Sequence, residues 1–448
     1  MTLLTYLQSL ESVRGSTSVL LKYPSELHHF DLDLDKLPNV IAHVLALVKR
    51  DYASPSDIPP HSRWRHFEVA PKQQGVKDRL GPLISSWKQT RVPTLEIVKR
   101  LLDLFIVSVL LDAGAGADWH YTPVDEPDQI YNRSEGLALA SLDWFLAGGF
   151  SHDATQPHQV TAQKLKTLTK EDLIRAFQVS ESNPLIGQDR IQLLVRLGHV
   201  CESFDAYFGT LPPRPGNLVD FLLNSKETVK EGSKIHVHVD TLWEVVMQGL
   251  SGVWPPTRTR LGDVPLGDVW PSQAMASIAQ KHPESIPGPP RTAESRSLVT
   301  FHKLSQWLTY SLMEPLSLLG IEFVGLDQMT GLAEYRNGGL FVDAGVLKLK
   351  EGVWTGSGIP QFAPHEDVIV EWRALTVGLL DLVGQGVREA LGMSREALPL
   401  VKVLEAGMSF FVKIHLLGTW KAGREMAAKL RPQTKGPPIE IISDGTVF

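Results

Sequence analysis

The sequence predicts a mostly α-helical fold with a few short strands, and three observations lead to this prediction. Apolar residues recur at helical spacing in several long segments. Glycines and capping residues stand near the ends of these segments, where helices begin and end. Strand-like runs are few, and the sequence lacks the βαβ rhythm that is typical of a doubly wound parallel sheet.

The first half of the chain is expected to contain five helices. Residues 38–52 place several apolar side chains on one face at helical spacing. Residues 94–112 predict a long apolar helix with Thr94 as its N-cap. Thr169 and Asp172 have the spacing of a capping box at a helix start. The other three expected helices span residues 134–148, 168–179 and 189–208.

The second half begins with an irregular stretch. Residues 251–296 are rich in proline, glycine and tryptophan, which predicts a long loop or an interdomain crossing because prolines remove helix hydrogen bonds. Helices are expected at 297–319 and 366–392. Residues 339–349 alternate apolar and other residues, which predicts a short strand or hairpin edge.

Composition narrows the class of protein. The single cysteine, Cys201, forms no internal disulfide, which favours a reducing compartment. The chain has 44 basic and 50 acidic residues, so bulk basicity does not indicate nucleic-acid binding. No secretory signal is visible, and the most apolar stretch, residues 101–111, is too short to cross a bilayer. We expect a cytoplasmic protein without membrane or nucleic-acid partners.

Generic catalytic motifs are missing from the sequence. It contains no phosphate-binding loop of the GxxxxGK[ST] type, no HExxH and no GxSxG. His236, His238 and Asp240 in KIHVHVD could face one side of a strand as metal ligands, but a half-exposed strand with its polar positions outward is the favoured interpretation. No metal or cofactor is therefore expected.

Three local clusters of polar residues are harder to explain by packing. The first surrounds two helix ends, where polar groups can face solvent on a rigid scaffold. It contains Asp112, Trp119, Tyr121, Arg133 and Glu135.

The second cluster is FHKLSQW (301–307), in which His302 and Gln306 share a helical face beside Lys303. The third is LAEYRNGG (332–339), with Glu334, Tyr335 and Arg336 in succession. Two further candidates, Glu371 and Arg373, lie in an apolar helix, where charges are costly to bury unless they are paired. A structural salt-bridge network and a site for an anionic small molecule both remain open.

Long motifs in these clusters resemble the uracil catabolism protein 4 family over nearly the whole chain, which favours one family unit over residues 1–448. Composition allows a subdivision into 1–225, 226–296 and 297–448. One departure is MSFFVKIHLL (408–417), which interrupts the family pattern between Gly407 and Gly418 and would disturb the roles of Glu405, Thr419 and Trp420. The matching motifs are IPPHSRWRHF (58–67), VSVLLDAGAGADWHY (107–121), NRSEGLALASLD (132–143), GDVW (267–270), FHKLSQWL (301–308), LAEYRNGGLFVDAGVL (332–347), VEWRALTV (370–377) and ISDGTVF (442–448).

A fainter resemblance links FHKLSQ, LAEYR and VEWRAL to the queuosine 5′-phosphate N-glycosidase family. It implies a helical architecture related to helix-hairpin-helix DNA glycosylases and an enzyme that cleaves a base–ribose bond. Members of that family carry an aspartate at the position of Glu334, and their lysine and glutamine match Lys303 and Gln306. The change to glutamate keeps the charge and lengthens the side chain by one methylene.

Together the two resemblances imply an N-glycosidase of uracil degradation. A ring-opened uridine product, ribosylurea or its 5′-phosphate, would lose urea by hydrolysis of its N-ribosyl bond. Such bonds break through an oxocarbenium-like transition state, which a carboxylate stabilises. The expected catalytic carboxylate is Glu334, followed by Asp112 and Glu371.

The remaining roles follow the same hypothesis. His302 or Tyr335 would protonate the leaving nitrogen. Lys303, Arg336 and Arg373 are cations suited to a 5′-phosphate. Trp119 and Tyr121 would line the sugar. The alternatives are a uracil phosphoribosyltransferase-like enzyme, for which the sequence lacks the expected phosphate loop after a strand, and a non-catalytic regulator of the pathway.

Overall fold

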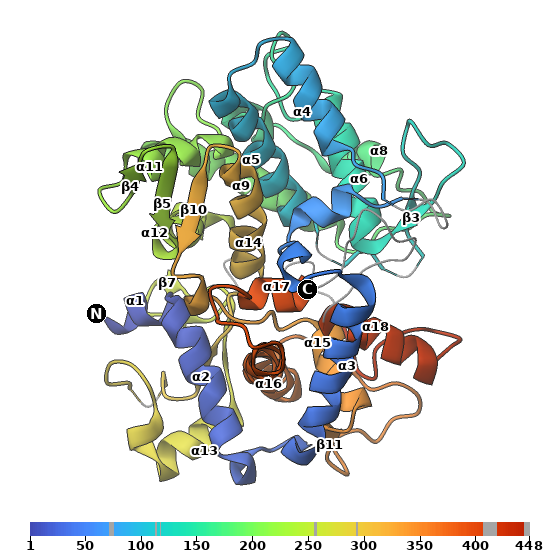
Figure 1. The fold of residues 1–448 in the computed structure, drawn as a ribbon, viewed down its shortest axis with the longest axis vertical. Helices are drawn as coiled ribbons and strands as arrows, with labels where there is room; N and C mark the ends of the chain where they lie inside the picture. The colour runs from blue at the N-terminus through green and yellow to red at the C-terminus, as the bar shows by residue number, and fades with distance from the viewer. Residues whose placement is uncertain are drawn as a thin grey trace. The chain divides into compact units, whose positions relative to one another are not determined.

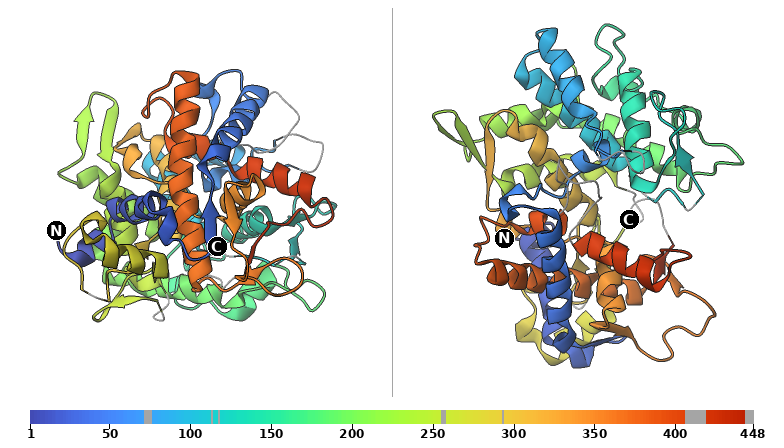
Figure 2. Two further views of the ribbon diagram at one scale, coloured as in Figure 1. Left: turned by 90° about the horizontal axis from the view of Figure 1, so that it is seen from below. Right: turned by 45° about the vertical axis from the view of Figure 1, so that its right-hand side comes forward.

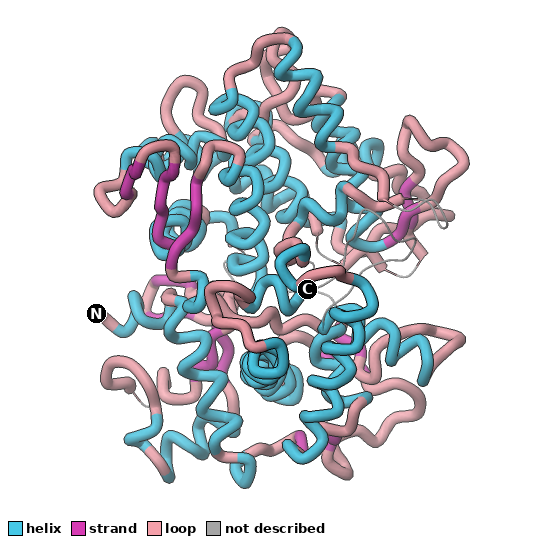
Figure 3. The backbone as a smooth tube through the Cα atoms, in the orientation of Figure 1, coloured by secondary structure: helices cyan, strands magenta, loops and turns pink. Residues whose placement is uncertain are grey.

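The computed structural model describes residues 1–70, 76–112, 114–116, 118–254, 258–292, 294–405 and 419–442. Helices form most of its regular structure, and the strands are short (Figure 3). The prediction of a mostly α-helical chain is confirmed, whereas the likeness to DNA glycosylases stays a prediction. The interrupting segment 408–417 lies outside the described residues, as do the side chains of Glu405 and Trp420.

The chain divides into two compact units, each built from separate stretches of sequence. Among the described residues, the first contains 1–61, 258–306 and 326–442, and the second contains 62–254 and 307–325. One of the boundaries falls inside helix α14 (Lys303–Ser317), after its first turn. These boundaries differ from positions 225 and 296, which composition had suggested.

Helix α16 (Asp367–Leu391) lies at the centre of the first unit, as residues 366–392 predicted. Figure 1 shows it end-on between α2 (Leu10–Lys22) and α3 (Leu37–Asp51), and the left view of Figure 2 shows it lengthwise. Both helices pack against it. Its apolar residues are buried almost all round, which is typical of a helix enclosed by neighbours.

The other helices of the first unit surround this core. Helix α15 packs against both α16 and α18, and α17 also contacts them. The short strands form antiparallel pairs β1–β11, β6–β7 and β8–β9 and a parallel pair β12–β13. The bounds are α1 (Leu3–Leu7), α13 (Gln273–Lys281), α15 (Tyr335–Asp343), α17 (Leu400–Glu405), α18 (Thr419–Leu430), β1 (Phe30–Leu32), β6 (Arg260–Leu261), β7 (Val264–Pro265), β8 (Val269–Pro271), β9 (Leu298–Thr300), β11 (Leu347–Leu349), β12 (Gln361–Phe362) and β13 (Glu440–Ile441).

The strand expected over residues 339–349 is wrong for most of that range. Its first half belongs to α15, and only the end forms strand β11, which pairs with β1. Leu340 and Phe341 are adjacent and both fully buried, because α15 is covered by α16 on one side and α18 on the other. The expected strand included only the last five residues of α15, a stretch too short to show helical spacing.

Helix α18 comes very close to α15 at a glycine. A Cβ added to Gly423 would lie 2.2 Å from the carbonyl oxygen of Arg336, closer than any real contact. Only glycine therefore permits this approach of the two helices.

The loop expected over residues 251–296 is also only partly correct. It contains helix α13, the antiparallel pair β6–β7 and strand β8, which pairs with β9 beyond the end of the stretch. The prolines Pro271 and Pro283 stand outside α13, and Ser272 caps it by accepting a hydrogen bond from the Met275 N–H. Prolines at helix flanks are compatible with a helix between them, which the composition argument did not allow for.

Helix α5 (Thr94–Leu110) forms the core of the second unit, as residues 94–112 predicted. Its last ten residues are all buried, and it packs against α4, α6 and α9. Thr94 is the first helical residue and Pro93 precedes it without a side-chain cap, so the expected N-cap is displaced by one residue. Within the described ranges no helix combines the length and the apolar character that crossing a membrane requires.

The capping box predicted at Thr169 and Asp172 is confirmed at the start of α8. The strand interpretation of KIHVHVD is confirmed for Lys234–His238, which form β5 and pair with β4 and β10, whereas Asp240 lies in the first turn of α12. The second unit has the bounds α4 (Leu80–Gln89), α6 (Arg133–Leu146), α7 (Ala162–Leu165), α8 (Lys170–Ala176), α9 (Ile191–Ser203), α10 (Asp205–Phe208), α11 (Leu218–Asn224), α12 (Val239–Glu244), β2 (His120–Tyr121), β3 (Tyr131–Asn132), β4 (Val229–Glu231), β5 (Lys234–His238) and β10 (Ile321–Val324).

One carboxylate links three segments of the second unit. Asp103, fully buried in α5, accepts hydrogen bonds from the backbone N–H groups of Val160 (2.9 Å) and Gly216 (2.6 Å). It also accepts one from Nε of Arg214 at 2.8 Å, and the side chain of Arg214 is only 5% exposed. The charge in this apolar helix is therefore paired.

We expect Asp103→Ala to lower the free energy of unfolding by about 3–5 kcal/mol, because it leaves the buried Arg214 without its closest partner. Urea denaturation followed by circular dichroism measures the change. Asp220→Ala is the control, since Asp220 pairs with Lys99 at the surface and should cost about 0–1 kcal/mol. Equal losses in both variants would contradict the assignment.

Candidate functional site

A buried ion pair organises the polar residues of the first unit. The guanidinium of Arg373, on α16, donates to both oxygens of Asp268, at 2.8 and 2.7 Å. Asp268 also accepts hydrogen bonds from the backbone N–H of Lys303 (3.0 Å) and from Nε1 of Trp270 (2.7 Å). Because Lys303 is the first residue of α14, Asp268 joins the start of that helix to α16.

The surroundings of Asp268 favour its ionised form. Burial alone would raise the pKa of Asp268, but the Arg373 guanidinium and the hydrogen bonds hold that pKa well below its usual range. The Arg373 side chain is 1% exposed, and its guanidinium lies 4.0 Å from the centre of the Phe301 ring. The pair thus stays ionised and fixes the geometry around it.

The Lys303 side chain reaches the carboxylate of Glu334. Its Nζ lies 3.3 Å from Oε1, and the two side chains are 11% and 14% exposed. Glu334 is the residue directly before α15 and stands at its N-cap position. Its second oxygen, Oε2, is buried and accepts no hydrogen bond from the residues that the structure describes. This oxygen can accept a proton from a bound molecule.

Gln306 fixes the loop that leads to Glu334. Its Nε2 donates to Oγ1 of Thr330 (2.9 Å), and its Oε1 accepts the Thr330 N–H (3.0 Å). Asn337 holds the other side of Glu334, because its amide donates to the Leu332 carbonyl (3.2 Å) and accepts from Thr419 (3.0 Å). Both amides are buried, so they position the carboxylate rather than contact a ligand.

The neighbours of this pair make their own contacts. Nε2 of His302 lies 2.8 Å from the carbonyl oxygen of Leu7 and donates to it, and burial lowers the pKa of His302. The guanidinium of Arg336 lies 5.1 Å from the centre of the Tyr335 ring and donates to the Lys435 carbonyl at 3.1 Å. The three cations expected to bind a phosphate, Lys303, Arg336 and Arg373, each have a partner within the protein.

Glu371 has a different role from the one expected. Its oxygens accept the backbone N–H groups of His28 (2.8 Å), His29 (2.9 Å) and Phe30 (2.9 Å), and the residue is fully buried. Residues two apart on a helix do not face each other, so Glu371 and Arg373 serve different neighbours. Glu371 fixes the segment that leads into β1.

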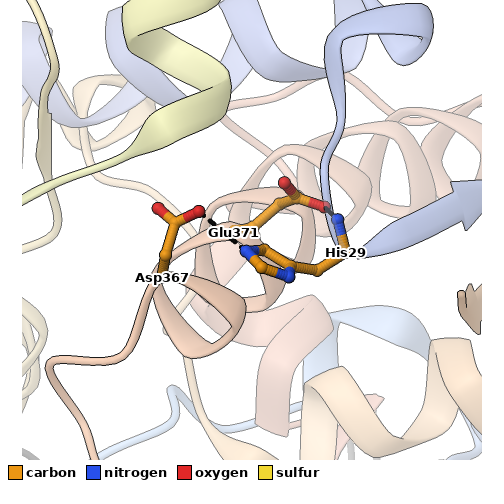
Figure 4. A group of neighbouring side chains, drawn as sticks. All are labelled: His29, Asp367 and Glu371. Carbon is orange, nitrogen blue, oxygen red and sulfur yellow. Dashed lines mark hydrogen bonds and ion pairs between the residues drawn. The ribbon is translucent and has the colours of Figure 1, made fainter. Parts of the chain in front are cut away.

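Figure 4 shows Glu371 beside His29 and Asp367. In the described part of the chain these three side chains are the group whose potential metal-ligand atoms lie within 4.8 Å of one another. The ring of His29 is already bonded to Asp367 at 2.8 Å, and Glu371 accepts three backbone hydrogens. This arrangement stabilises the fold through hydrogen bonds and leaves little acceptor capacity for a metal ion.

The stability that His29 contributes should depend on pH. Burial opposes its protonation, but the bond to Asp367 and the charge of Glu371 outweigh burial and raise the pKa of His29. Its contribution is therefore complete below the ordinary histidine pKa of about 6.5 and is lost as pH rises through the raised value. We expect the free energy of unfolding of His29→Gln to approach that of wild type with increasing pH.

Urea denaturation of both proteins between pH 5.5 and 9 measures this trend. His365→Gln, at an exposed position, should differ little from wild type over the same series. A difference between His29→Gln and wild type that grows with pH would contradict the sign.

Among the predicted site residues of the second unit, Asp112 pairs with a buried arginine, and Trp119 and Tyr121 belong to the core. Arg63, fully buried, donates to Asp112 (2.7 Å) and to Oγ of Ser108 (2.9 Å). Burial lowers the pKa of Arg63, and the charges of Asp112 and Glu135 act in the opposite direction. Arg133, at the start of α6, is exposed and has a positive φ of 53°. Asp112 thus neutralises a buried arginine.

Trp119 and Tyr121 form part of the core of the second unit. Trp119 is 0% exposed and donates to the Phe177 carbonyl at 3.0 Å. The Tyr121 hydroxyl donates to Asp143 at 2.8 Å, and burial raises the pKa of Tyr121. Their rings stack 6.4 Å apart. Trp119 therefore has no surface with which to line a sugar site.

The sequence analysis missed Asp268 as a functional candidate. The residue lies in GDVW (267–270), which contributed to the family resemblance but stands in a stretch assigned to a loop. A lone aspartate in a loop is usually solvated, and nothing in its sequence neighbours indicates Arg373 as its partner. Arg373 was the one signal that could have indicated Asp268. An arginine buried in an apolar helix needs a carboxylate as its counter-charge, and the sequence analysis named none.

Removing Asp268 should destabilise the first unit. We expect Asp268→Ala to lower the free energy of unfolding by about 3–5 kcal/mol, because the Arg373 guanidinium stays buried without its counter-charge. Thermal unfolding followed by near-ultraviolet circular dichroism tests this. The exposed Asp263→Ala serves as control and should change stability by less than about 0.5 kcal/mol. A wild-type stability for Asp268→Ala would show that the pair does not hold the two helices.

The fold and this site define a mostly α-helical protein with a partly buried carboxylate–ammonium pair between two helix starts. Residues 6–448 match the family model described as "Protein of unknown function (DUF1688)", and the chain belongs to this family. It is 40% identical to "Uracil catabolism protein 4" of Lachancea kluyveri and 40% identical to "Protein urg3" of Schizosaccharomyces pombe (strain 972 / ATCC 24843). Each comparison covers 99% of this chain and 98% of the relative. The resemblance to the uracil catabolism protein 4 family is confirmed.

Proposed function

We propose that this protein is an enzyme of uracil catabolism that hydrolyses the N-ribosyl bond of ribosylurea or ribosylurea 5′-phosphate and releases urea. The name of the Lachancea kluyveri relative, "Uracil catabolism protein 4", supports a place in uracil catabolism. The observation that carries the reaction is the buried Oε2 of Glu334, which accepts no hydrogen bond from the described residues, beside the ammonium of Lys303. A buried acceptor without a partner calls for an explanation, and a substrate supplies one.

Glu334 is the proposed general base. A water oxygen forms a bond to C1′ of the ribose while the bond from C1′ to the urea nitrogen breaks, and the carboxylate takes a proton from that water. The cleavage passes through a cation-like sugar, which a nearby carboxylate stabilises electrostatically. The products are a free sugar hydroxyl and urea, so one water is consumed.

The leaving nitrogen takes up one proton. Of the two donors expected from the sequence, His302 donates its Nε2–H as a hydrogen bond to the Leu7 carbonyl, so the hydroxyl of Tyr335 is the proposed proton donor. Tyr335 is the residue after Glu334 and is half-buried. Lys303 holds Oε1 of Glu334, which leaves Oε2 as the oxygen for the water.

A second line of support is the resemblance of Lys303, Gln306 and Glu334 to residues of another enzyme family. They are the positions that match the lysine, glutamine and catalytic carboxylate of the queuosine 5′-phosphate N-glycosidases. Gln306 and Asp268 hold the backbone on which this pair depends. Effective positioning of a general base typically accelerates a reaction about 10²–10⁴-fold.

The decisive assay uses ribosylurea and ribosylurea 5′-phosphate as substrates and follows free urea through a coupled enzyme. We expect wild type to release urea from at least one of them. Glu334→Gln keeps the shape and removes the base, so its kcat should fall about 10²–10⁴-fold. Glu351→Gln, an exposed site in the same unit, should keep wild-type kcat.

Full activity of Glu334→Gln would overturn the assignment of the base. Release of no urea by folded wild type from either substrate would overturn the glycosidase proposal itself. Activity on only one of the two compounds decides whether the substrate carries a phosphate.

A further inference from the structure

A small cavity of about 110 Å³ lies in the first unit, beside the C-terminal half of α16. Its lining carries three guanidinium groups, of Arg14, Arg388 and Arg395, and two carboxylates, of Asp327 and Asp381. The volume is several times the roughly 30 Å³ that a water molecule occupies in the liquid. The cavity has room for a small polar ion.

One wall of the cavity is an ordered ion pair. Nε of Arg14, on α2, donates to Asp381 on α16 at 2.8 Å. The same guanidinium donates to the carbonyl oxygens of Asp327 (2.8 Å) and Met329 (2.7 Å). Arg14 is thus satisfied within the protein and neutralises Asp381. The wall is rigid and close to neutral.

The lining also carries the guanidinium groups of Arg388 and Arg395, and the carboxylates of Asp381 and Glu389 offset only part of the positive charge at Arg388. Arg388 is 9% exposed, and its Nη1 makes one long hydrogen bond, 3.4 Å, to the carbonyl of Leu398. No carboxylate of the described residues lies within 4.0 Å of its guanidinium. Burial lowers the pKa of Arg388, and the positive charge of Arg395 adds to this effect. A largely buried cation thus lies near a second cation.

The chain makes room for this buried guanidinium. Gly384 lies one turn before Arg388 on α16, and a Cβ at position 384 would lie 3.4 Å from Nη1 and 3.5 Å from Nη2. It would also lie 2.7 Å from the Leu400 side chain. The glycine lets the arginine side chain fold back along its own helix toward the cavity.

We propose that this cavity binds a phosphate group between the guanidinium groups of Arg388 and Arg395. A buried guanidinium without a counter-ion is unfavourable, and a phosphate supplies both charge and hydrogen-bond acceptors. Arginine has planar donors that match the oxygens of phosphate in pairs. Inorganic phosphate and a phosphate monoester share this chemistry.

This site is separate from the pair that carries the proposed reaction. Arg373 and Arg388 are fifteen positions apart on α16, and at 1.5 Å per residue this corresponds to roughly 22 Å along the helix. The phosphate site therefore does not depend on the proposed function, and its ligand is bound rather than converted there.

Isothermal titration of the full chain with inorganic phosphate, at constant ionic strength, tests the proposal. A parallel titration uses glycerol 3-phosphate as the monoester, because ribose 5-phosphate is the product of the proposed reaction and would also bind at the Glu334 site. We expect one saturable site for at least one of them. Arg395→Gln, at an exposed position, should fold normally and weaken the binding at least tenfold. Arg388→Lys keeps the charge but loses the paired donors and should also weaken it at least tenfold.

Two control variants separate this site from others. Arg175→Gln removes an exposed arginine of the second unit and should leave the affinity unchanged. Glu334→Gln should also leave it unchanged, which separates this proposal from the glycosidase proposal. Absence of saturable binding by either compound, or equal affinity in wild type and both Arg395→Gln and Arg388→Lys, would overturn the proposal. Tighter binding of the monoester than of inorganic phosphate would identify an organic phosphate as the ligand, and the reverse would identify the free ion.

Discussion

The bidentate pair of Asp268 and Arg373 is the interaction on which the site of the first unit depends. It joins the start of α14 to the central helix α16, and the same carboxylate accepts the backbone N–H of Lys303. The side chain of Lys303 then determines where the carboxylate of Glu334 lies. A buried charge pair stabilises a fold only when its remaining hydrogen-bonding groups are satisfied. Trp270 and the helix start satisfy those of Asp268 here.

The polar residues of the first unit separate into two kinds. Glu371, His302 and Gln306 give their hydrogen-bonding groups to the protein's own backbone, so they serve the fold. Glu334 differs, because a protein cation holds one oxygen and the other is buried without a described partner. Polar residues crowded in a sequence look alike, and only their partners distinguish a supporting residue from one that can act on a ligand.

Local patterns predicted most of the long helices. The helices at 38–52, 94–112 and 366–392 begin and end within two residues of the expected limits, because periodic apolar faces and end signals are properties of the sequence itself. The end of helix α15 was taken for a strand because only its last five residues lay in the stretch that was assigned. The site was predicted as separate clusters. The contacts of Lys303 with Glu334, and of Asp268 with Arg373, depend on tertiary packing and have no local signal.

The arrangement of the first unit has a consequence for how the chain is made. Helix α2 packs against α16, and about 345 residues of chain lie between them. At a synthesis rate of about 5–20 residues per second, α16 is synthesised roughly 17–70 s after α2. During this interval the apolar face of α2 has no α16 to pack against. Contacts between such distant segments form slowly and leave hydrophobic surface open to aggregation. Co-translational protection by chaperones should therefore matter more for the N-terminal helices than for the continuous stretch 62–254.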